Sequence, residues 1–363
     1  MIVCSKKMKN NIERILKFDR TEETKLIIRE IMGKYEELPD SENQRMKELT
    51  GNDGRIDLDI IPNIILPSGI AATAWYTEGW YLLPNDNPCL MKKMLSFMGQ
   101  YGKVENAHYQ PEEYNAMICQ ALAEIFELPS AKYYMAKKNG NEYMLTPDFL
   151  RDGEELIHIA RIEETITGKK QSTTAIQGET KKISQMHQYL EEYLRNYQYK
   201  GKKLEETQIQ IVLLDYIKQK FFNRFVKNTD EHVFNTAIVI NGEKVKMSDM
   251  YDYDFTLARK TTDVVPGCEW KGLENEMLLD NGKSDIVSFI EQYKDYPGFQ
   301  EFIRKIINNF SIARLEQIIL RNTGIKIDRV ETKKHYEIIE ENFKETVNAY
   351  NRFYIKQRKG EER

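Results

Sequence analysis

The sequence predicts an α+β protein of two lobes, with a small β-rich N-terminal lobe and a larger, mostly helical C-terminal lobe. Three observations support this fold class. The segment 58–146 combines strand-like runs with a single helical pattern, and most of the chain after Pro147 has helical periodicity. Apolar residues make up 41% of the 363 residues, including 21 Tyr and 15 Phe, which is enough to bury a sizeable core.

The first 57 residues are predicted to form a helical extension and a linker. Residues 8–38 show a helical pattern, with Thr21 as a candidate N-cap and apolar side chains recurring on one face. Residues 39–57 are polar and rich in turn-forming residues, as in PDSEN and GNDG. We interpret them as a linker or flexible loop.

The segment 58–146 is predicted to be the small lobe. Its first part is typical of a strand, a loop at Ser68–Gly69 and a hairpin that turns at Glu78–Gly79. Pro111 then opens a helix with an acidic first turn. The pair Asn139–Gly140, between two further strand-like runs, favours a hairpin with a type I′ turn.

The segment 147–363 is predicted to be the larger lobe. The polar stretch 166–182 has no period and indicates a mobile loop. Residues 205–227 form a long helical pattern that is apolar on several sides, which predicts a buried helix. A hairpin turning at Asn241–Gly242 follows, and 284–358 contain three or four amphipathic helices.

Composition excludes several classes of protein. The 53 basic and 57 acidic residues nearly balance, so direct contact with nucleic acid is not expected. The four Cys are far apart and form no C-x-x-C pair, which argues against a zinc site or a disulfide framework. Reduced thiols are typical of a cytoplasmic protein. The chain shows neither a signal peptide nor a membrane-spanning run, although secretion as an effector stays open.

The stretch from Asn228 to Asp254, NTDEHVFNTAIVINGEKVKMSDMYDYD, carries the chemistry. Asp230 and Asn235 stand five residues apart, and Asp252 and Asp254 follow a short apolar hairpin. A phosphoryl-transfer site of the protein-kinase type needs this order: one carboxylate accepts the proton of the attacking hydroxyl, and an Asn and a later Asp bind magnesium. The hairpin can return the later Asp to the Asn, so that oxygen ligands converge on one cation. On spacing alone, a polar loop whose carboxylates cap turns is an equal alternative.

The elements NTDEHVFN and MYDYD resemble the signature of HipA-like serine/threonine kinases, a bacterial branch of the protein-kinase-like fold. The resemblance implies that ATP and Mg²⁺ are cofactors and that Asp230 is the catalytic Asp. It further implies that Asn235 and Asp252 are magnesium ligands, with Asp254 competing for the role of Asp252. His232 falls on the family's His and is expected to brace the loop.

In the small lobe the resemblance is one of outline. Glu113, near the start of the helix after Pro111, is expected to pair with a nucleotide-binding Lys. By sequence, Glu112 is equally placed for this role, and for either residue the alternative is a first-turn carboxylate that interacts with the helix dipole. The backbone of Met144, Leu145 and Thr146 is expected to contact adenine at the connection between the lobes. An ordinary edge strand is the alternative interpretation.

One departure from the family concerns the phosphate-contacting Lys, which the family carries in a strand of the pattern Tyr-aliphatic-aliphatic-Lys-Pro. Here the matching text is GWYLLPN, with Leu83 at the position of the Lys. Either one of the nearest lysines (Lys92, Lys93 and Lys103) takes the role, or the match is misplaced in this lobe, or nucleotide binding is degenerate. The Ser68–Gly69 loop is expected to cover the phosphates, with a simple turn as the alternative.

The resemblance therefore implies an ATP- and magnesium-dependent kinase that phosphorylates a Ser or Thr of a protein substrate. Its setting would be the bacterial cytoplasm. A toxin–antitoxin pair is one arrangement in this family, in which the antitoxin would be a separate protein. Two alternatives stay open: a kinase-fold phosphotransferase that acts on a small molecule or a lipid, and a pseudokinase that serves as an interaction module.

Overall fold

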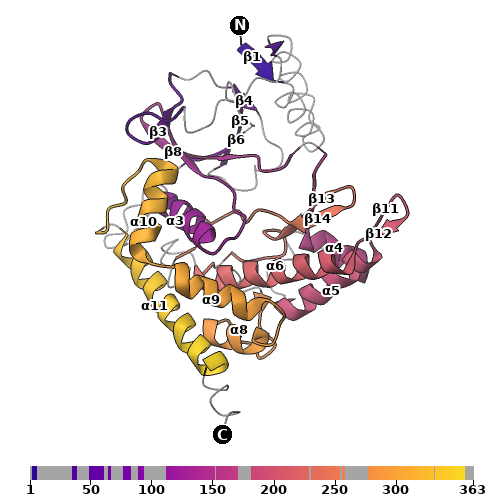
Figure 1. Cartoon of the computed structure of the whole chain (residues 1–363). Helices are drawn as coiled ribbons and strands as arrows, with labels where there is room; N and C mark the ends of the chain where they lie inside the picture. The colour runs from indigo at the N-terminus through magenta and orange to yellow at the C-terminus, as the bar shows by residue number, and fades with distance from the viewer. Residues whose placement is uncertain are drawn as a thin grey trace.

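The computed structural model describes residues 2–5, 35–38, 49–60, 64–66, 77–82, 89–93, 112–151, 153–170, 181–228, 230–253, 256–257, 277–330 and 332–355. These residues form a sheet-based part and a larger helical part, which lie at the top and the bottom of Figure 1. The predicted lobe boundaries, 57/58 and 146/147, stay predictions.

A six-stranded mixed sheet is the main feature of the smaller part. Its strands are β3 (Arg55–Asp57), β4 (Ile64–Leu66), β5 (Thr77–Leu82), β6 (Cys89–Lys93), β7 (Tyr134–Lys138) and β8 (Asn141–Pro147). Their order is β3-β7-β8-β6-β5-β4, and every neighbouring pair is antiparallel except β3 with β7. Asn139 and Gly140 turn the β7–β8 hairpin with φ of 49° and 72°, as the predicted type I′ turn requires.

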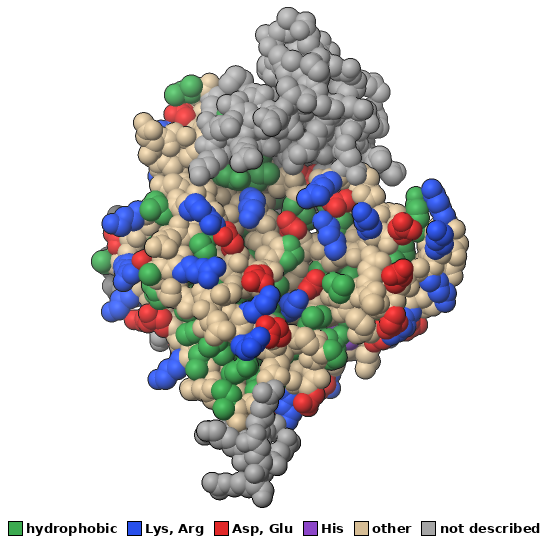
Figure 2. Space-filling model, viewed as in Figure 1, with side chains coloured by type: hydrophobic (Ala, Val, Ile, Leu, Met, Phe, Trp, Pro, Cys, Tyr) green, Lys and Arg blue, Asp and Glu red, His purple; other side chains and the backbone are tan. Residues whose placement is uncertain are grey.

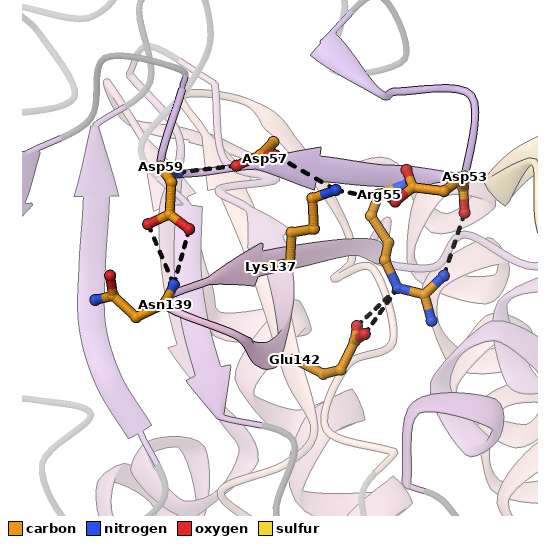
Figure 3. Close-up of polar contacts among 7 residues, drawn as sticks. All are labelled: Asp53, Arg55, Asp57, Asp59, Lys137, Asn139 and Glu142. Atoms are coloured by element: carbon orange, nitrogen blue, oxygen red, sulfur yellow. Dashed lines mark hydrogen bonds and ion pairs between the residues drawn. The ribbon is translucent and has the colours of Figure 1, made fainter.

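Charged side chains tie the edge strand β3 to the β7–β8 hairpin (Figure 3). The Nε of Arg55 donates to Glu142 at 2.8 Å, and the Nζ of Lys137 lies 3.1 Å from Asp53 and 3.3 Å from Asp57. All five side chains are partly exposed, so solvent screens each of these pairs and their contribution to stability is small. The network fixes the register of a three-residue strand more than it stabilises the fold.

Two predictions for the N-terminal region are wrong. Tyr35–Leu38 is a strand, β2, that pairs in parallel with β1 (Ile2–Ser5), where the pattern predicted a helix. Arg55–Asp57 belongs to the sheet and not to a linker, because Ile56 is fully buried in the core beneath the sheet. Both errors involve pairing with distant segments, which local periodicity does not report. The remainder of the predicted helix 8–38 lies outside the described residues.

Glu78–Gly79 does not turn a hairpin, in contrast to the prediction. Strand β5 runs through both residues, and its pairing with β6 shifts register between Thr77 and Gly79. A Gly inside a strand often marks such an irregularity. Ser68–Gly69 and Leu83 lie outside the described residues.

Helix α3 (Glu112–Ile125) begins directly after Pro111, as predicted. Its apolar side chains share one hydrophobic core with Met135 and Met144 of the sheet and with the C-terminal helices. It packs against α10 (Ile312–Thr323), where Asn322 donates to Glu124 at 3.1 Å. Figure 1 shows α3 beside α10, below the sheet.

The larger part is built mainly of helices. They are α4 (Ile159–Thr167), α5 (Ile183–Asn196), α6 (Glu206–Phe225), α8 (Ile286–Tyr293), α9 (Phe299–Asn309), α10, α11 (Lys333–Tyr350) and a short π-helical turn η3 (Asn351–Ile355). The predicted buried helix and the predicted C-terminal helices are confirmed. α10 shows why its ends lie where they do: the Ser311 side chain accepts from the N–H of Arg314 at 3.2 Å, and Gly324 ends the helix with φ 73°.

A three-stranded antiparallel sheet crosses this helical part, in the order β14 (Lys244–Met247), β13 (Ala237–Asn241), β9 (Glu155–His158). Asn241 pairs with Lys244, so the hairpin turns at Gly242–Glu243, one residue later than predicted. Two short pairs complete the description: β10 (Lys181–Lys182) with β15 (Met277–Leu278), and β11 (Gln198–Tyr199) with β12 (Lys202–Lys203).

Basic and acidic side chains alternate over the helical part on the face seen in Figure 2, as the balanced composition leads one to expect. On this face, the described residues do not gather into a large region of one sign. Among the described helices, none combines the length and the apolar character that a bilayer crossing requires.

Candidate active site

The loop that carries Asp230 and Asn235 connects α6 to β13. Asn228 starts it: its N–H donates to the backbone oxygen of Asn223 at 2.8 Å, and its Oδ1 accepts from the N–H of Asp230 at 3.0 Å. The Nδ2 of Asn235 donates to the backbone oxygen of Asp230 at 3.2 Å and to its Oδ2 at 3.3 Å. The five-residue spacing thus closes the loop and brings the two side chains into contact.

The ring of His232 lies inside this loop and contacts Asp230. Its Nδ1 accepts from the N–H of Phe234 at 3.2 Å, and its Nε2 lies 3.5 Å from Oδ1 of Asp230. Burial lowers the pKa of His232 to about 4, against an opposing contribution from the charge of Asp252. The ring is therefore neutral near pH 7, and because Nδ1 accepts a hydrogen bond, its proton resides on Nε2 and faces Asp230. Both contacts lie within the loop, and the bracing role of His232 stays a prediction.

The chain returns to this loop after the β13–β14 hairpin. The hydroxyl of Tyr251 donates to the backbone oxygen of Phe234 at 3.0 Å, which seats the returning segment against the loop. Asp252 follows, and its carboxyl group is near enough to His232 to influence the pKa of that ring. The structure therefore brings Asp230 and Asn235 into contact, and the segment that carries Asp252 returns to the same loop through Tyr251. Asp254 lies outside the described residues.

A buried ionic cluster of Lys220, Arg224 and Glu231 anchors the loop to helix α6. Glu231 is 1% exposed; its carboxylate lies 3.1 Å from Lys220 and 2.9 Å from Arg224, both on α6. Burial by itself raises the pKa of Glu231, but the two cations outweigh it and keep the carboxylate ionised. Lys220 also donates to Thr236 at 2.7 Å, so one side chain contacts both the middle of the loop, at Glu231, and its far end.

Sequence reasoning missed this cluster. The signal was present: Lys220 and Arg224 stand four residues apart in a helix whose pattern already predicted burial on several sides. Two cations on one buried helix face require an acidic partner. Glu231 stands between the two candidate functional residues Asp230 and His232, and it is the acidic residue of NTDEHVFN to which the sequence analysis gave no role.

The oxygen atoms of this site fit a hard divalent cation. Asn235 uses its amide nitrogen toward Asp230, which directs its Oδ1, an acceptor, the other way. Together with the carboxylates of Asp230 and Asp252, the donor set is all oxygen, as Mg²⁺ prefers. No group of three or more His, Cys, Asp or Glu suited to a metal occurs among the described residues.

The predicted adenine-contacting residues lie on β8. Met144 and Leu145 pair with β6 on one side and with β7 on the other. Thr146 and Pro147 pair with β6 only, so the backbone side that faces away from β6 is unpaired within the sheet at these two residues. Of the three predicted contacts, Thr146 is thus the one best placed to meet a ligand.

Strand β6 lies next to β8, on the side away from β7. This position bears on which residue replaces the phosphate-contacting Lys of the family. The sequence match placed the family's Lys strand at GWYLLPN, which is β5 and its end; in the structure β6 separates β5 from β8. β6 carries Lys92 and Lys93, two of the candidates named above, whereas Lys103 lies outside the described residues. Glu112 and Glu113 lie in the first turn of α3, and their side chains are also outside the described part.

Comparisons with known proteins give a structural match and no sequence match. No family model and no curated protein matches the chain. The crystal structure of the Helicobacter pylori proinflammatory kinase CtkA aligns with 82% of this chain and 98% of its own length, at 10% identity and a TM-score of 0.55. The chain has a protein-kinase-like fold. At this identity the likeness extends to fold and not to activity.

A second matched structure is the HipA toxin of Shewanella oneidensis MR-1 in complex with HipB and operator DNA. It aligns with 91% of this chain and 70% of its own length, at 11% identity and a TM-score of 0.41. The predicted fold class, a bilobal kinase-like α+β fold, is confirmed by the CtkA match.

Proposed function

We propose that this chain is an ATP- and Mg²⁺-dependent phosphotransferase, and that its acceptor is a Ser or Thr hydroxyl of a protein. One observation carries the proposal: in a kinase-like fold, Asp230 and Asn235 are in contact, and the residue before Asp252, Tyr251, contacts the same loop. A catalytic carboxylate, an Asn and a later Asp are the groups that phosphoryl transfer of the kinase type uses.

Asp230 is the proposed catalytic base. The acceptor oxygen attacks the γ-phosphorus of ATP, the bond from that phosphorus to the β,γ-bridging oxygen breaks, ADP leaves, and the hydroxyl proton goes to the Asp230 carboxylate. Neutral His232 supports this role, because its Nε2–H orients the carboxylate without cancelling its charge. Asn235 holds the other carboxylate oxygen.

Asn235 and Asp252 are the proposed magnesium ligands, with Asp254 as the competing candidate for the later position. When bound, the ion neutralises the phosphate charge that develops during transfer. The protein fixes the positions of these two ligands. Asn235 is held by its hydrogen bond to Asp230, and Asp252 follows Tyr251, which is hydrogen-bonded to the loop.

Lys92 is the residue that we assign to the phosphates. The register of β6 with β8 puts it opposite Met144, whose side chain lies in the core shared with α3. Directly paired residues share one face of a sheet, and successive residues alternate between faces. The assignment therefore favours Lys92 over Lys93, and it pairs the lysine with an acidic residue of the first turn of α3, Glu113 or Glu112.

The remaining nucleotide contacts stay proposals from the sequence resemblance. Thr146 would meet adenine through its backbone, and the Ser68–Gly69 loop would cover the phosphates. A cytoplasmic location and a separate antitoxin-like partner rest on the same resemblance. Copurification of the full chain from its native host would identify such a partner.

The test measures transfer of the labelled γ-phosphate of ATP in the presence of Mg²⁺. The acceptors, tested in parallel, are a protein mixture, the chain itself and a panel of small-molecule and lipid alcohols. We expect label on protein Ser or Thr. Asp230→Asn should lower the rate by about 10²–10⁴-fold, the usual contribution of general base catalysis, with nucleotide affinity nearly unchanged.

The matched control is Asp215→Asn, which alters an aspartate of α6 that pairs with Lys218 at 2.8 Å, outside the catalytic loop, and should keep full activity. Label on small molecules alone would favour the alternative phosphotransferase. Binding of ATP without transfer to any acceptor would favour the pseudokinase.

A further inference from the structure

The backbone of Asp252 is in an unusual conformation. Its φ is 63°, in the left-handed region that residues other than Gly adopt only at an energetic cost. The residue lies between Tyr251 and Tyr253, whose side chains are fixed by contacts of their own. A contact that stabilises the left-handed backbone conformation of Asp252 is therefore expected.

The hydroxyl of Tyr133 supplies such a contact. The backbone N–H of Asp252 donates to Oη of Tyr133 at 3.1 Å. Tyr133 is 4% exposed, and its ring lies 5.7 Å from the ring of Tyr253. The hydrogen bond is partly buried, and leaving the N–H at this position without an acceptor would cost free energy.

Tyr133 is in turn fixed by α3. Its own N–H donates to Oε1 of Gln120, a 5%-exposed side chain in the middle of that helix, at 3.0 Å. The path from helix to loop is short: Gln120 holds the Tyr133 backbone, and the Tyr133 side chain holds the Asp252 backbone. α3 and the candidate ion-binding residue are thus joined through one tyrosine.

The same two segments are also joined beside this path. Backbone hydrogen bonds connect Ala131 to Met250 at 2.9 Å and Met250 to Pro129 at 3.0 Å. The Oγ of Ser130 lies 3.0 Å from the hydroxyl of Tyr253. These bonds join the segment 129–131 to Met250 and Tyr253 without involving Asp252. Removing one of them is therefore a control for the specific role of Tyr133.

We propose that Tyr133 is a positioning residue that sets the Asp252 carboxylate for ion binding by holding the Asp252 backbone, and that it couples this carboxylate to α3. The inference rests on the proposed function, since it concerns the same site. Residues one step away from a metal ligand commonly set its orientation, and their loss lowers metal affinity about 10- to 100-fold. Tyr133 acts in this way through the backbone of the ligand.

The test is calorimetric binding of a non-hydrolysable ATP analogue, with and without Mg²⁺, to the full chain and three variants. Tyr133→Phe removes only the oxygen that accepts from Asp252. Ser130→Ala removes a hydrogen bond between the same segments. Tyr354→Phe removes a hydroxyl that is buried without a hydrogen-bond partner among the described residues, on η3.

We expect Tyr133→Phe to weaken Mg²⁺-dependent binding by about 10-fold, within the range typical of such partners. Ser130→Ala and Tyr354→Phe should stay within about 2-fold of the wild type, and binding without Mg²⁺ should be alike in all four proteins. Should Tyr133→Phe reduce folding as judged by circular dichroism, Gln120→Met replaces it, and it should also weaken the Mg²⁺-dependent term because it loosens Tyr133.

Two results overturn the inference while leaving the proposed function in place: Mg²⁺-dependent binding by the Tyr133 variant equal to that of the wild type, or an equal loss in Ser130→Ala. The second result would mean that the contact only stabilises the fold. Absence of Mg²⁺-dependent binding by the wild type would overturn the proposed function, and the inference with it.

Discussion

At the residue scale, the carboxylate of Asp230 is constrained from two directions. Asn235 contacts one oxygen and the Nε2 of neutral His232 faces the other. The motif predicted Asp230 and Asn235 as functional partners, and the family resemblance added His232 as the residue that braces their loop. The motif did not predict the backbone of Asp252, since a left-handed Asp is held by a tyrosine more than a hundred residues earlier in the chain.

The first prediction at this scale separates Asp252 from Asp254. Asp252→Ala removes a proposed direct ligand, so it should weaken binding of the Mg²⁺–nucleotide complex by more than about 10-fold. Asp254→Ala should have the smaller effect. Calorimetric titration of both variants measures this, and a reversed ranking would assign the later ligand position to Asp254.

At the element scale, buried ion pairs and a hydrogen bond connect α6 to the loop that follows it. Lys220 and Arg224 project from the helix into a buried site and hold Glu231, and Lys220 also reaches Thr236 at the far end of the loop. The burial of α6 was predictable from its apolar pattern. The partner of its two cations was not, because periodicity reports which face is buried and not which polar groups meet there.

Glu231→Gln is predicted to destabilise the protein strongly. The variant leaves two buried cations without their counter-charge, and breaking a buried ion pair from one side costs about 3–5 kcal/mol. Denaturant unfolding measures the loss. The matched control is Glu316→Gln, which breaks an ion pair with the exposed Arg329 and should cost much less stability, because solvent screens that pair. Equal losses would mean that the buried cluster does not anchor the loop.

The strand β6 gives a second prediction at this scale. Lys92→Met should weaken ATP binding by about 10- to 100-fold, as expected for the loss of a charge-assisted hydrogen bond worth about 1.5–3 kcal/mol. Lys93→Met should leave binding nearly unchanged, because Lys93 pairs with Tyr143, a residue of the other core of the sheet. Fluorescence titration with a labelled nucleotide compares the two. A loss confined to Lys93→Met would reverse the assignment.

At the scale of the whole molecule, α3 shares its core with the sheet above it and the helices below it. Asn115 of α3 accepts from Nε2 of His335 on α11 at 2.5 Å, and Lys305 of α9 pairs with Glu127 just after α3 at 2.7 Å. The order of α3 and the later helices followed from periodicity. The sheet order did not, because the pairing of β6 with β8 joins segments about 50 residues apart, a contact that depends on tertiary packing.

The contact between α3 and α11 predicts a pH dependence of stability. Burial lowers the pKa of His335 to about 4, with a smaller contribution in the same direction from Lys334 and an opposing one from the Thr332 backbone. The unfolded chain takes up this proton near pH 6.5 and the folded protein does not until about pH 4. Stability from this residue is therefore complete above pH 6.5 and is lost as the pH falls toward 4.

His335→Gln keeps a donor for Asn115 and removes the titration. Between pH 7 and pH 5 it should lose about 2 kcal/mol less stability than the wild type. Denaturant unfolding at the two pH values measures the difference. Equal losses in the two proteins would show that His335 takes up its proton in the folded state as readily as in the unfolded chain.

The most direct measurement of the central claim is a crystal structure of the chain with Mg²⁺ and a non-hydrolysable ATP analogue. The account predicts an ion bound by oxygens of Asn235 and Asp252 and by phosphate oxygens, with the γ-phosphate facing Asp230. An ion and nucleotide bound elsewhere, with Asp230 turned away from the phosphates, would contradict it.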